Sequence, residues 1–369
     1  MLNGYEPNHG IPRVGIWKGM LMREEMNSIE RTLRTLAFKP VDRVPVDLHN
    51  FMLTPRFMDV TDLPAFFRDG EAMAEGQIRA WRRYGHDVLL LENGTAALAE
   101  ACGVEVKYQE DSAPVASEPA IQSLDEVDSL EVPDPYQDPL LSELLKATRI
   151  VVEEIGDQAF IMGRADQGPF SLACEIRGMS NFLLDITTPE KQDKVHQLLD
   201  FCRQVTERYA LAQMEQGAHA TSVGDSPSGP DLISPDFYRQ FAYPYMKELA
   251  QRMREKDIIL AYHICGNATP IIEDMINTGA SIIEIDQKSD QKEVKAAAAG
   301  KATLLGPIDP SGVMANGTPE LVMEKCQEAL DNLSPGGGFI LGPGCALPNT
   351  TPDENIDALI EAAKKYQLP

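Results

Sequence analysis

The chain has 369 residues, of which 43% are hydrophobic, so it can bury the core of at least one large domain. Its net charge of −24 argues against nucleic-acid binding, which needs a basic surface. The longest apolar runs, such as Val88–Leu91, are too short to cross a bilayer, so we expect no membrane segment. The N-terminus lacks the apolar stretch of a secretion signal. We therefore expect a cytoplasmic protein in which residues 1–25 form a short extension.

The first helix is expected from Ser28 to about Phe38, with Asn27 as its N-cap, where it would cover the bottom or a flank of the fold. Short β-rich runs then recur along the chain, and most are followed by an amphipathic helical stretch. The runs are Arg43–Leu48, Asp87–Glu92, Gln158–Arg164, His219–Gly224, Asp257–Tyr262, Ser281–Ile285, Ala302–Leu305 and Gly338–Leu341. Strands that alternate with helices in this way predict a parallel (β/α)8 TIM barrel, in one domain over residues 26–369. A doubly wound open sheet is the second choice, because no strand is followed by a glycine motif for a dinucleotide or phosphate.

Four further helices and one excursion complete the pattern. The segments Thr188–Gln216 and Pro235–Lys256 predict long helices, and Thr318–Asn332 and Pro352–Tyr366 predict shorter ones. After the second strand, Ala97–Pro139 is rich in Glu, Asp, Ser and Pro, and we expect a hairpin-like excursion and a surface loop there.

The chain has six cysteines, and without a secretion signal they do not predict disulfides. Four lie in apolar or amphipathic helical stretches and are expected to be core residues: Cys102, Cys174, Cys202 and Cys326. The other two, Cys265 and Cys345, lie in glycine-rich surroundings.

His263, Cys265 and Cys345 predict a catalytic zinc site. His263 and Cys265 are two positions apart after an apolar run, so both can project inward at the carboxyl end of a barrel strand. Cys345 lies in a Gly/Pro-rich loop after the last predicted strand, at the same face. One imidazole and two thiolates suit Zn²⁺, and three protein ligands leave one position open. His263 and Cys265 alone are also compatible with a hydrogen-bonded histidine and a small buried cysteine. The addition of Cys345 makes a metal site the favoured interpretation.

Several segments match one known family. A His-x-Cys followed far downstream by a single Cys, and the opening Arg31–Leu33 with Pro40–Pro45, carry the likeness. Further matches are residues 163–170 with Leu172, Asp225–Ser226, 234–238 and 243–245. The chain resembles the uroporphyrinogen decarboxylase superfamily. Within it, the chain resembles the cobalamin-dependent zinc methyltransferases, which include the methylcorrinoid:coenzyme M methyltransferases.

This resemblance implies a zinc-dependent methyltransferase that works with a separate corrinoid protein. Methylcobalamin would methylate a small-molecule thiol, or cob(I)alamin would take the methyl group from a methylated donor. True decarboxylases carry an arginine-rich segment after the first strand, whereas Asp47–Leu53 has no arginine and the next one is Arg56. We therefore rank a metal-free uroporphyrinogen-type decarboxylase lower. A non-catalytic zinc- or corrinoid-binding protein is the other alternative.

Polar residues at other strand ends are candidates for the rest of the site. Asp286 resembles an acidic position of the coenzyme M enzymes and is expected to be a fourth ligand or a partner of the ligands, as is Glu284. For Asp286, a helix-capping or loop role is the competing interpretation. The residues expected to line the substrate site are Asp225, Glu92, Asn93, Asn50, His49, Arg164 and Asp166. Tyr262 is expected to pack, and no role is assigned to His9, His86, His196 or His219. The sequence does not identify the methyl donor or acceptor.

Overall fold

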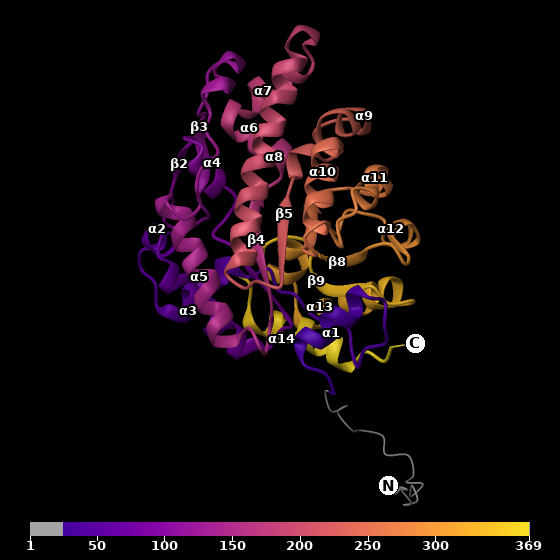
Figure 1. Ribbon diagram of the computed structural model, residues 1–369. Coiled ribbons are helices and arrows are strands. Elements are labelled where there is room, and N and C mark those ends of the chain that lie inside the picture. The colour runs from indigo at the N-terminus through magenta and orange to yellow at the C-terminus, as the bar shows by residue number, and fades with distance from the viewer. Residues whose placement is uncertain (1–24, 369) are drawn as a thin grey trace, which may run out of the picture.

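A curled parallel sheet of seven strands forms the centre of a TIM-barrel-like fold (Figure 1). The computed structural model describes residues 25–368, so the predicted extension of residues 1–25 lies outside the described residues except for Glu25. The strands are β1 (Val88–Leu91), β4 (Phe160–Gln167), β5 (Ala220–Gly224), β6 (Ile259–Ile264), β7 (Ile282–Ile285), β8 (Thr303–Ile308) and β9 (Phe339–Pro343). Their order follows the chain without the reversal point of a doubly wound sheet, so that second choice is wrong.

The predicted first strand, Arg43–Leu48, does not form a regular strand. It makes a single parallel bridge to each edge of the sheet, Val46 with Leu341 of β9 and Asp47 with Val88 of β1. Pro45 has no N–H group to donate, which limits the ladder that this segment can form. Its carbonyl still accepts a hydrogen bond from the Leu341 N–H at 2.9 Å. The segment therefore lies between the two edge strands.

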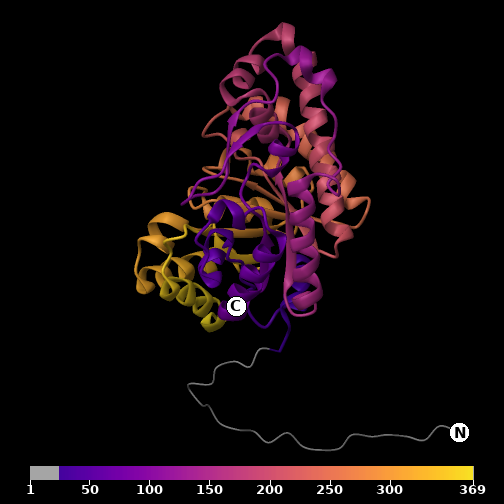
Figure 2. The ribbon, with the colours of Figure 1, turned by 90° about the vertical axis from the view of Figure 1, so that its left-hand side faces the viewer.

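Helices surround the sheet (Figures 1 and 2). The longer ones are α3 (Gly70–Tyr84), α5 (Pro139–Ile155), α8 (Gln192–Glu215), α10 (Tyr243–Arg254), α13 (Pro319–Leu333) and α14 (Asp353–Lys365). The shorter ones are α1 (Ser28–Leu36), α2 (Leu63–Phe66), α4 (Ala97–Ala101), α6 (Pro169–Arg177), α7 (Met179–Ile186), α9 (Pro235–Phe237), α11 (Ile272–Asn277) and α12 (Gln291–Ala298). Between β1 and β4, the strands β2 (Glu105–Lys107) and β3 (Val115–Glu118) form a separate antiparallel pair. None of the described helices is both long enough and apolar enough to span a bilayer.

The predicted helix Pro235–Lys256 is interrupted. Its first turn, α9, ends at Phe237, and a π-helical turn over Tyr238–Ala242 separates it from α10. Pro244 lies in the first turn of α10 and has no N–H group for a hydrogen bond to the preceding turn. The wider π turn accommodates that missing bond.

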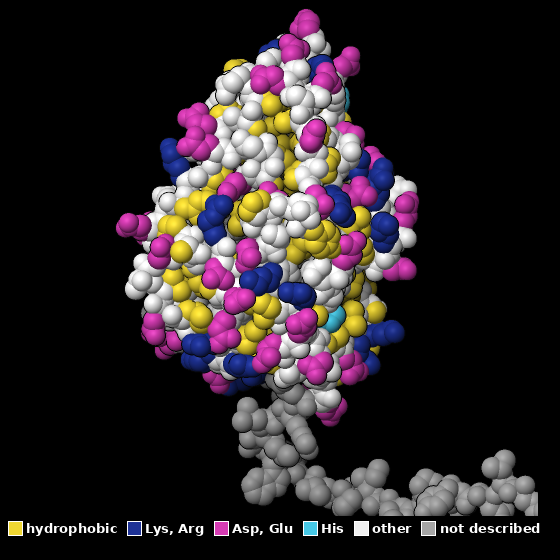
Figure 3. Space-filling view, turned by 60° about the vertical axis from the view of Figure 1, so that its left-hand side comes forward, with side chains coloured by type: hydrophobic (Ala, Val, Ile, Leu, Met, Phe, Trp, Pro, Cys, Tyr) yellow, Lys and Arg dark blue, Asp and Glu magenta, His cyan; other side chains and the backbone are white. Residues whose placement is uncertain are grey.

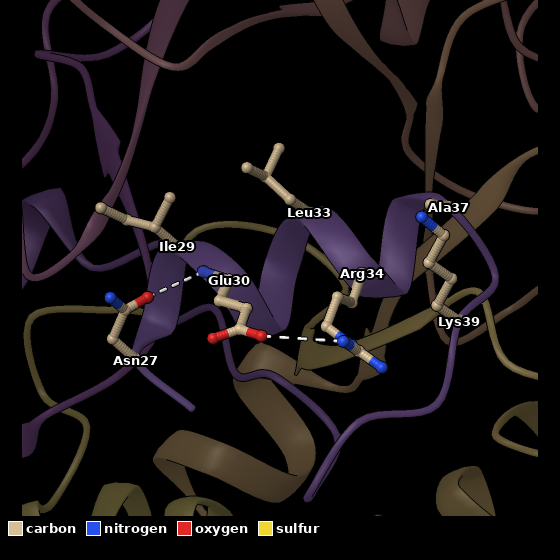
Figure 4. Close-up of a pocket in the computed structure, with 7 residues that line it drawn as sticks. All are labelled: Asn27, Ile29, Glu30, Leu33, Arg34, Ala37 and Lys39. Atoms are coloured by element: carbon tan, nitrogen blue, oxygen red, sulfur yellow. Dashed lines mark hydrogen bonds and ion pairs between the residues drawn. The ribbon is translucent and has the colours of Figure 1, made fainter. Parts of the chain in front are cut away.

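Helix α1 lies against β4 and β9 at the amino ends of the strands. As predicted, it begins after Asn27, whose side chain accepts a hydrogen bond from the Glu30 N–H at 2.8 Å. Arg31 reaches the Asp87 carboxylate just before β1, and Leu36 packs against the barrel interior. A hollow of about 400 Å³ lies beside the exposed side of this helix (Figure 4). It is at the amino end of the strands, whereas barrel enzymes place their chemistry at the carboxyl end.

The interior of the curled sheet has an apolar floor to which each of the sheet's seven strands contributes. These side chains form one buried cluster, separate from the core between sheet and helices: Val88, Leu90, Phe160, Met162, Ala220, Ala261, Ile282, Leu305 and Ile340. On the outer surface, acidic side chains are interspersed with Lys and Arg (Figure 3). The floor fixes which side chains of the next layer also point inward, because strand residues two apart face the same side.

Candidate metal centre and the polar layer around it

Above the apolar floor lies an inward-facing polar layer towards the carboxyl ends of the strands. Five polar residues each lie two positions after a residue of the apolar floor. Glu92 directly follows β1, and the other four lie in β4, β5, β6 and β7, respectively: Arg164, Ser222, His263 and Glu284. His49, which directly follows the segment 43–48, contacts two of them. We call these six residues the polar layer. Five of the six are ionisable, and all of them are buried.

His263, Cys265 and Cys345 meet at this layer. Their ligand atoms all lie within 4.8 Å of one another. The two sulfur atoms are 3.6 Å apart, and Nε2 of His263 is 2.9 Å from Sγ of Cys265. Two thiolates on one tetrahedral zinc ion would be about 3.8 Å apart, given Zn–S bonds of about 2.3 Å. The three side chains therefore fit a zinc ion after a small outward shift of the imidazole.

A hydrogen bond joins the thiol groups of Cys265 and Cys345. Their mutual hydrogen bond and the nearby His263 lower the pKa of Cys265 to about 3, despite its burial. The same contact, together with burial, raises the pKa of Cys345. A thiolate is therefore already favoured at this position, and thiolates are the form that binds metal.

Glycines and one carboxylate fix the loops that carry the cysteines. Gly266 follows Cys265 with φ +86°, and its N–H donates to the Asp286 carboxylate at 2.9 Å. Gly344 precedes Cys345, and a Cβ there would lie 3.0 Å from the Cα of Asp286, closer than ordinary packing allows. Asp286 and Glu284 are not in the three-residue group. Asp286 supports the turn behind Cys265.

Glu284 lies behind His263. Nδ1 of His263 is 3.3 Å from the Glu284 carbonyl oxygen and 3.7 Å from its carboxylate. Such a partner on the far ring nitrogen fixes the tautomer that presents Nε2 to a metal. Burial opposes ionisation of Glu284, but the charges of His263, His49 and Arg164 lower its pKa to about 2.

His49 and Arg164 are each held between the same two glutamates. Nε2 of His49 is 2.8 Å from Glu92 and its Nδ1 is 3.3 Å from Glu284. Arg164 lies 3.4 Å from Glu92 and 3.7 Å from Glu284. Burial would lower the pKa of His49, but Glu92 and Glu284 raise it to about 10. The layer thus holds two cations against two anions.

Four other predicted residues lie outside this group. Asp225 accepts the Ser171 N–H at 2.7 Å near the start of α6, and Asp166 accepts the Leu98 N–H at 2.8 Å in α4. Both carboxylates therefore satisfy helix N-termini. Asn93 donates to the Phe67 carbonyl at 3.1 Å. Asn50 is buried at the start of the loop after His49, and its amide atoms have no hydrogen-bond partner among residues 25–368.

The sequence interpretation missed Ser226, which lies next to Cys265, and Asp47, which lies next to the polar layer. The Ser226 hydroxyl accepts the Cys265 N–H at 3.2 Å. Asp47 is 1% exposed, and neither of its carboxylate oxygens has a hydrogen-bond partner within the described part of the chain. Its spacing of two from His49 on an extended segment was the available signal, because the two side chains then face the same way.

Comparison with known proteins identifies the family to which the chain belongs. The family model described as uroporphyrinogen decarboxylase (URO-D) matches residues 27–366. The chain belongs to the uroporphyrinogen decarboxylase family. Its family relatives include the methylcobamide:CoM methyltransferase MtbA of Methanosarcina mazei, 31% identical over 341 residues that cover 92% of this chain and 98% of the relative. The uroporphyrinogen decarboxylase of Coxiella burnetii is 26% identical over 352 residues, covering 92% and 95% of the two chains.

A solved structure of a methyltransferase from Methanosarcina mazei superposes with a TM-score of 0.84 at 27% identity, covering 92% of this chain and 98% of that one. The predicted resemblance to this family is therefore confirmed. Both named activities occur among its family relatives, so the site has to decide between them.

Proposed function

We propose that this protein is a corrinoid-dependent methyltransferase, which moves a methyl group between a corrinoid and a small-molecule thiol or methylated substrate. The observation that carries the proposal is the meeting of His263, Cys265 and Cys345 at the carboxyl face of the barrel. The methylcobamide:CoM methyltransferases, which match nearly the whole chain, support it.

His263, Cys265 and Cys345 would hold a zinc ion, and Glu284 would fix the imidazole of His263. Zinc in such a site supplies Lewis-acid chemistry, which favours the thiolate form of a substrate thiol or polarises a methyl donor. Asp286 and Ser226 hold the backbone around Cys265 in place.

In the direction of thiol methylation, the substrate sulfur attacks the methyl carbon of methylcobalamin. The carbon–cobalt bond breaks, and its electron pair stays on cobalt as cob(I)alamin, while the thiol proton leaves to solvent. A separate corrinoid protein would present the corrinoid at the carboxyl face of the barrel, where the cysteine-bearing loops lie. Demethylation of a methylated donor runs the same step with cob(I)alamin as the nucleophile.

The charge of the site disfavours the decarboxylase alternative. A uroporphyrinogen carries many carboxylates, which need arginines to bind them. Arg56, the first arginine after the first predicted strand, is directed away to Asp353 at 2.7 Å, and Arg164 already faces two glutamates. The polar layer therefore offers such a substrate little positive charge.

The test is a zinc and activity assay on the purified protein. We expect about one zinc ion per chain and thiol-dependent conversion of methylcobalamin to cob(I)alamin, followed by absorption spectroscopy under anoxic conditions. Cys265→Ala and Cys345→Ala should each lose both, whereas the matched variant Cys102→Ala should keep both. Zinc binding without methyl transfer, to or from any donor, would support a non-catalytic zinc protein. A zinc-free protein would count against the whole proposal.

We also propose that the seven strands and the segment 43–48 together make a closed (β/α)8 barrel in one domain over residues 26–369. The bridges of that segment to both sheet edges support this arrangement. The antiparallel pair β2 and β3 would then be an excursion after the barrel's second strand, and residues 1–25 an extension.

A further inference from the structure

The polar layer is balanced in charge before Asp47 is counted. His49 and Arg164 are its two basic groups besides the metal ligand His263, and both face Glu92 and Glu284. A zinc ion with two thiolate ligands is also neutral overall. An anionic substrate group entering this layer would therefore meet only cations that already face both glutamates, and burial of an excess charge is costly.

Asp47 adds to this region a buried acid that accepts no hydrogen bond from the described residues. Both of its carboxylate oxygens lack a hydrogen-bond partner within the described chain, although it is only 1% exposed. It shares an inward direction with Val88, its bridge partner, and interacts electrostatically with His49 and Glu284. A Cβ on Gly342 would lie 3.0 Å from the backbone oxygen of Asp47 and 3.4 Å from its Cβ, so the glycine allows the two segments to approach closely beside the acid. Unsatisfied buried acceptors are costly unless a ligand or water satisfies them.

We infer that Asp47 determines substrate specificity by accepting a hydrogen bond from an ammonium or hydroxyl group of the small molecule at the metal centre. The same layer rejects substrates that carry a sulfonate or carboxylate at that position. The inference rests on the proposed function, because it concerns the small molecule of that same reaction. It separates this protein from relatives named for coenzyme M, whose thiol carries a sulfonate.

Three thiols with the same two-carbon spacer test this directly. Cysteamine ends in an ammonium group, 2-mercaptoethanol in a hydroxyl group, and coenzyme M in a sulfonate. Binding is measured on the Co²⁺-substituted protein, where a third thiolate ligand increases the charge-transfer absorption that Cys265 and Cys345 already give, so the readout needs no corrinoid. Methyl transfer from methylcobalamin is measured separately on the zinc protein.

We expect cysteamine and 2-mercaptoethanol to bind at least about tenfold more tightly than coenzyme M. Asp47→Asn should reduce the cysteamine-to-coenzyme M affinity ratio by about tenfold or more. Comparing this ratio between proteins cancels the intrinsic differences among the thiols. Asp290→Asn removes an exposed helix-capping carboxylate on α12 and should leave the ratio unchanged.

Coenzyme M binding as tightly as cysteamine, or an unchanged ratio in Asp47→Asn, would overturn the inference. The thiol series on the unmodified protein decides the question even if Asp47→Asn does not fold. The two proposals fail differently. If the thiols bind with the expected order but none demethylates methylcobalamin, the specificity holds and the methyltransferase proposal fails. If methyl transfer is fastest to coenzyme M, the methyltransferase proposal holds and the specificity inference fails.

Discussion

Replacement of Asp87 by asparagine should destabilise the protein strongly, because this carboxylate joins α1 to the segment that lies between the sheet edges. Asp87 is fully buried and accepts hydrogen bonds from Arg31 at 2.6 Å and from Arg43 at 2.5 and 3.1 Å. It also accepts the Val46 N–H at 2.9 Å. Asparagine has the same shape, but it is neutral and directs an NH₂ group at arginine donors.

The structure sets the size of the effect. Arg31 keeps its second partner, Asp42, at 2.7 Å, so the variant does not leave both arginines uncompensated. Arg43 keeps its bond to the Val44 carbonyl at 3.1 Å but loses the charge of Asp87. Breaking a buried pair by removing one partner typically costs about 3–5 kcal/mol. We expect a loss of that size for Asp87→Asn.

Urea unfolding followed by circular dichroism measures this loss. Asp357→Asn is the matched control, because Asp357 also receives two hydrogen bonds from one arginine, Arg83, at 2.8 and 2.7 Å, but about half of its side chain is exposed. The control should lose less than about 1 kcal/mol. If both variants lose equally little free energy of unfolding, the reasoning that burial makes the ion pairs of Asp87 strongly stabilising is refuted.

Two further predictions concern the polar layer. Glu284→Gln should weaken zinc binding by about 10–100-fold, because His263 loses the anion behind its Nδ1. Competition with a chelating dye measures the zinc affinity, and substitution of the exposed Glu361 by glutamine is the control. Unchanged affinity in Glu284→Gln would contradict that role. Burial raises the pKa of Asp47 to about 7, an effect that the charge of His49 partly offsets. A carboxyl whose pKa is raised by folding binds its proton more tightly in the folded state, so its contribution to stability falls as the pH rises from about 4 to about 7. The protein should lose stability relative to Asp47→Asn across that range, as urea midpoints at several pH values would show, and parallel pH profiles would contradict the assignment.

Much of the fold was predictable because its signals are local. Alternation of apolar runs with amphipathic stretches located the strands, and the spacing of His263 and Cys265 gave their common direction. The prediction that Arg43–Leu48 forms a regular strand was wrong. Pro45 limits the hydrogen bonding of this segment, and only two bridges hold it between the sheet edges. The break in Pro235–Lys256 was missed, because a proline in the first turn of a helix does not by itself reveal that a π turn precedes it.

The site was predictable only in part, because a carboxylate at a strand end has two directions open to it. Glu92 and Glu284 turn inward, whereas Asp166 and Asp225 turn to the N-termini of neighbouring helices. All four lie near the end of a strand or follow one, so position alone does not separate them. The contact between His49 and Glu284 joins residues 235 positions apart, and no local pattern reports it.

The separation of the cysteines has a mechanical consequence. Cys265 and Cys345 are 80 positions apart, and the elements from α11 to β9 lie between their loops along the chain. A metal held by both would act as a reversible crosslink that clamps the end of the chain to its middle. Loss of the metal would then release the loop after β9 first, so proteolytic cleavage near Ala346 would report metal occupancy while the rest of the barrel stays folded.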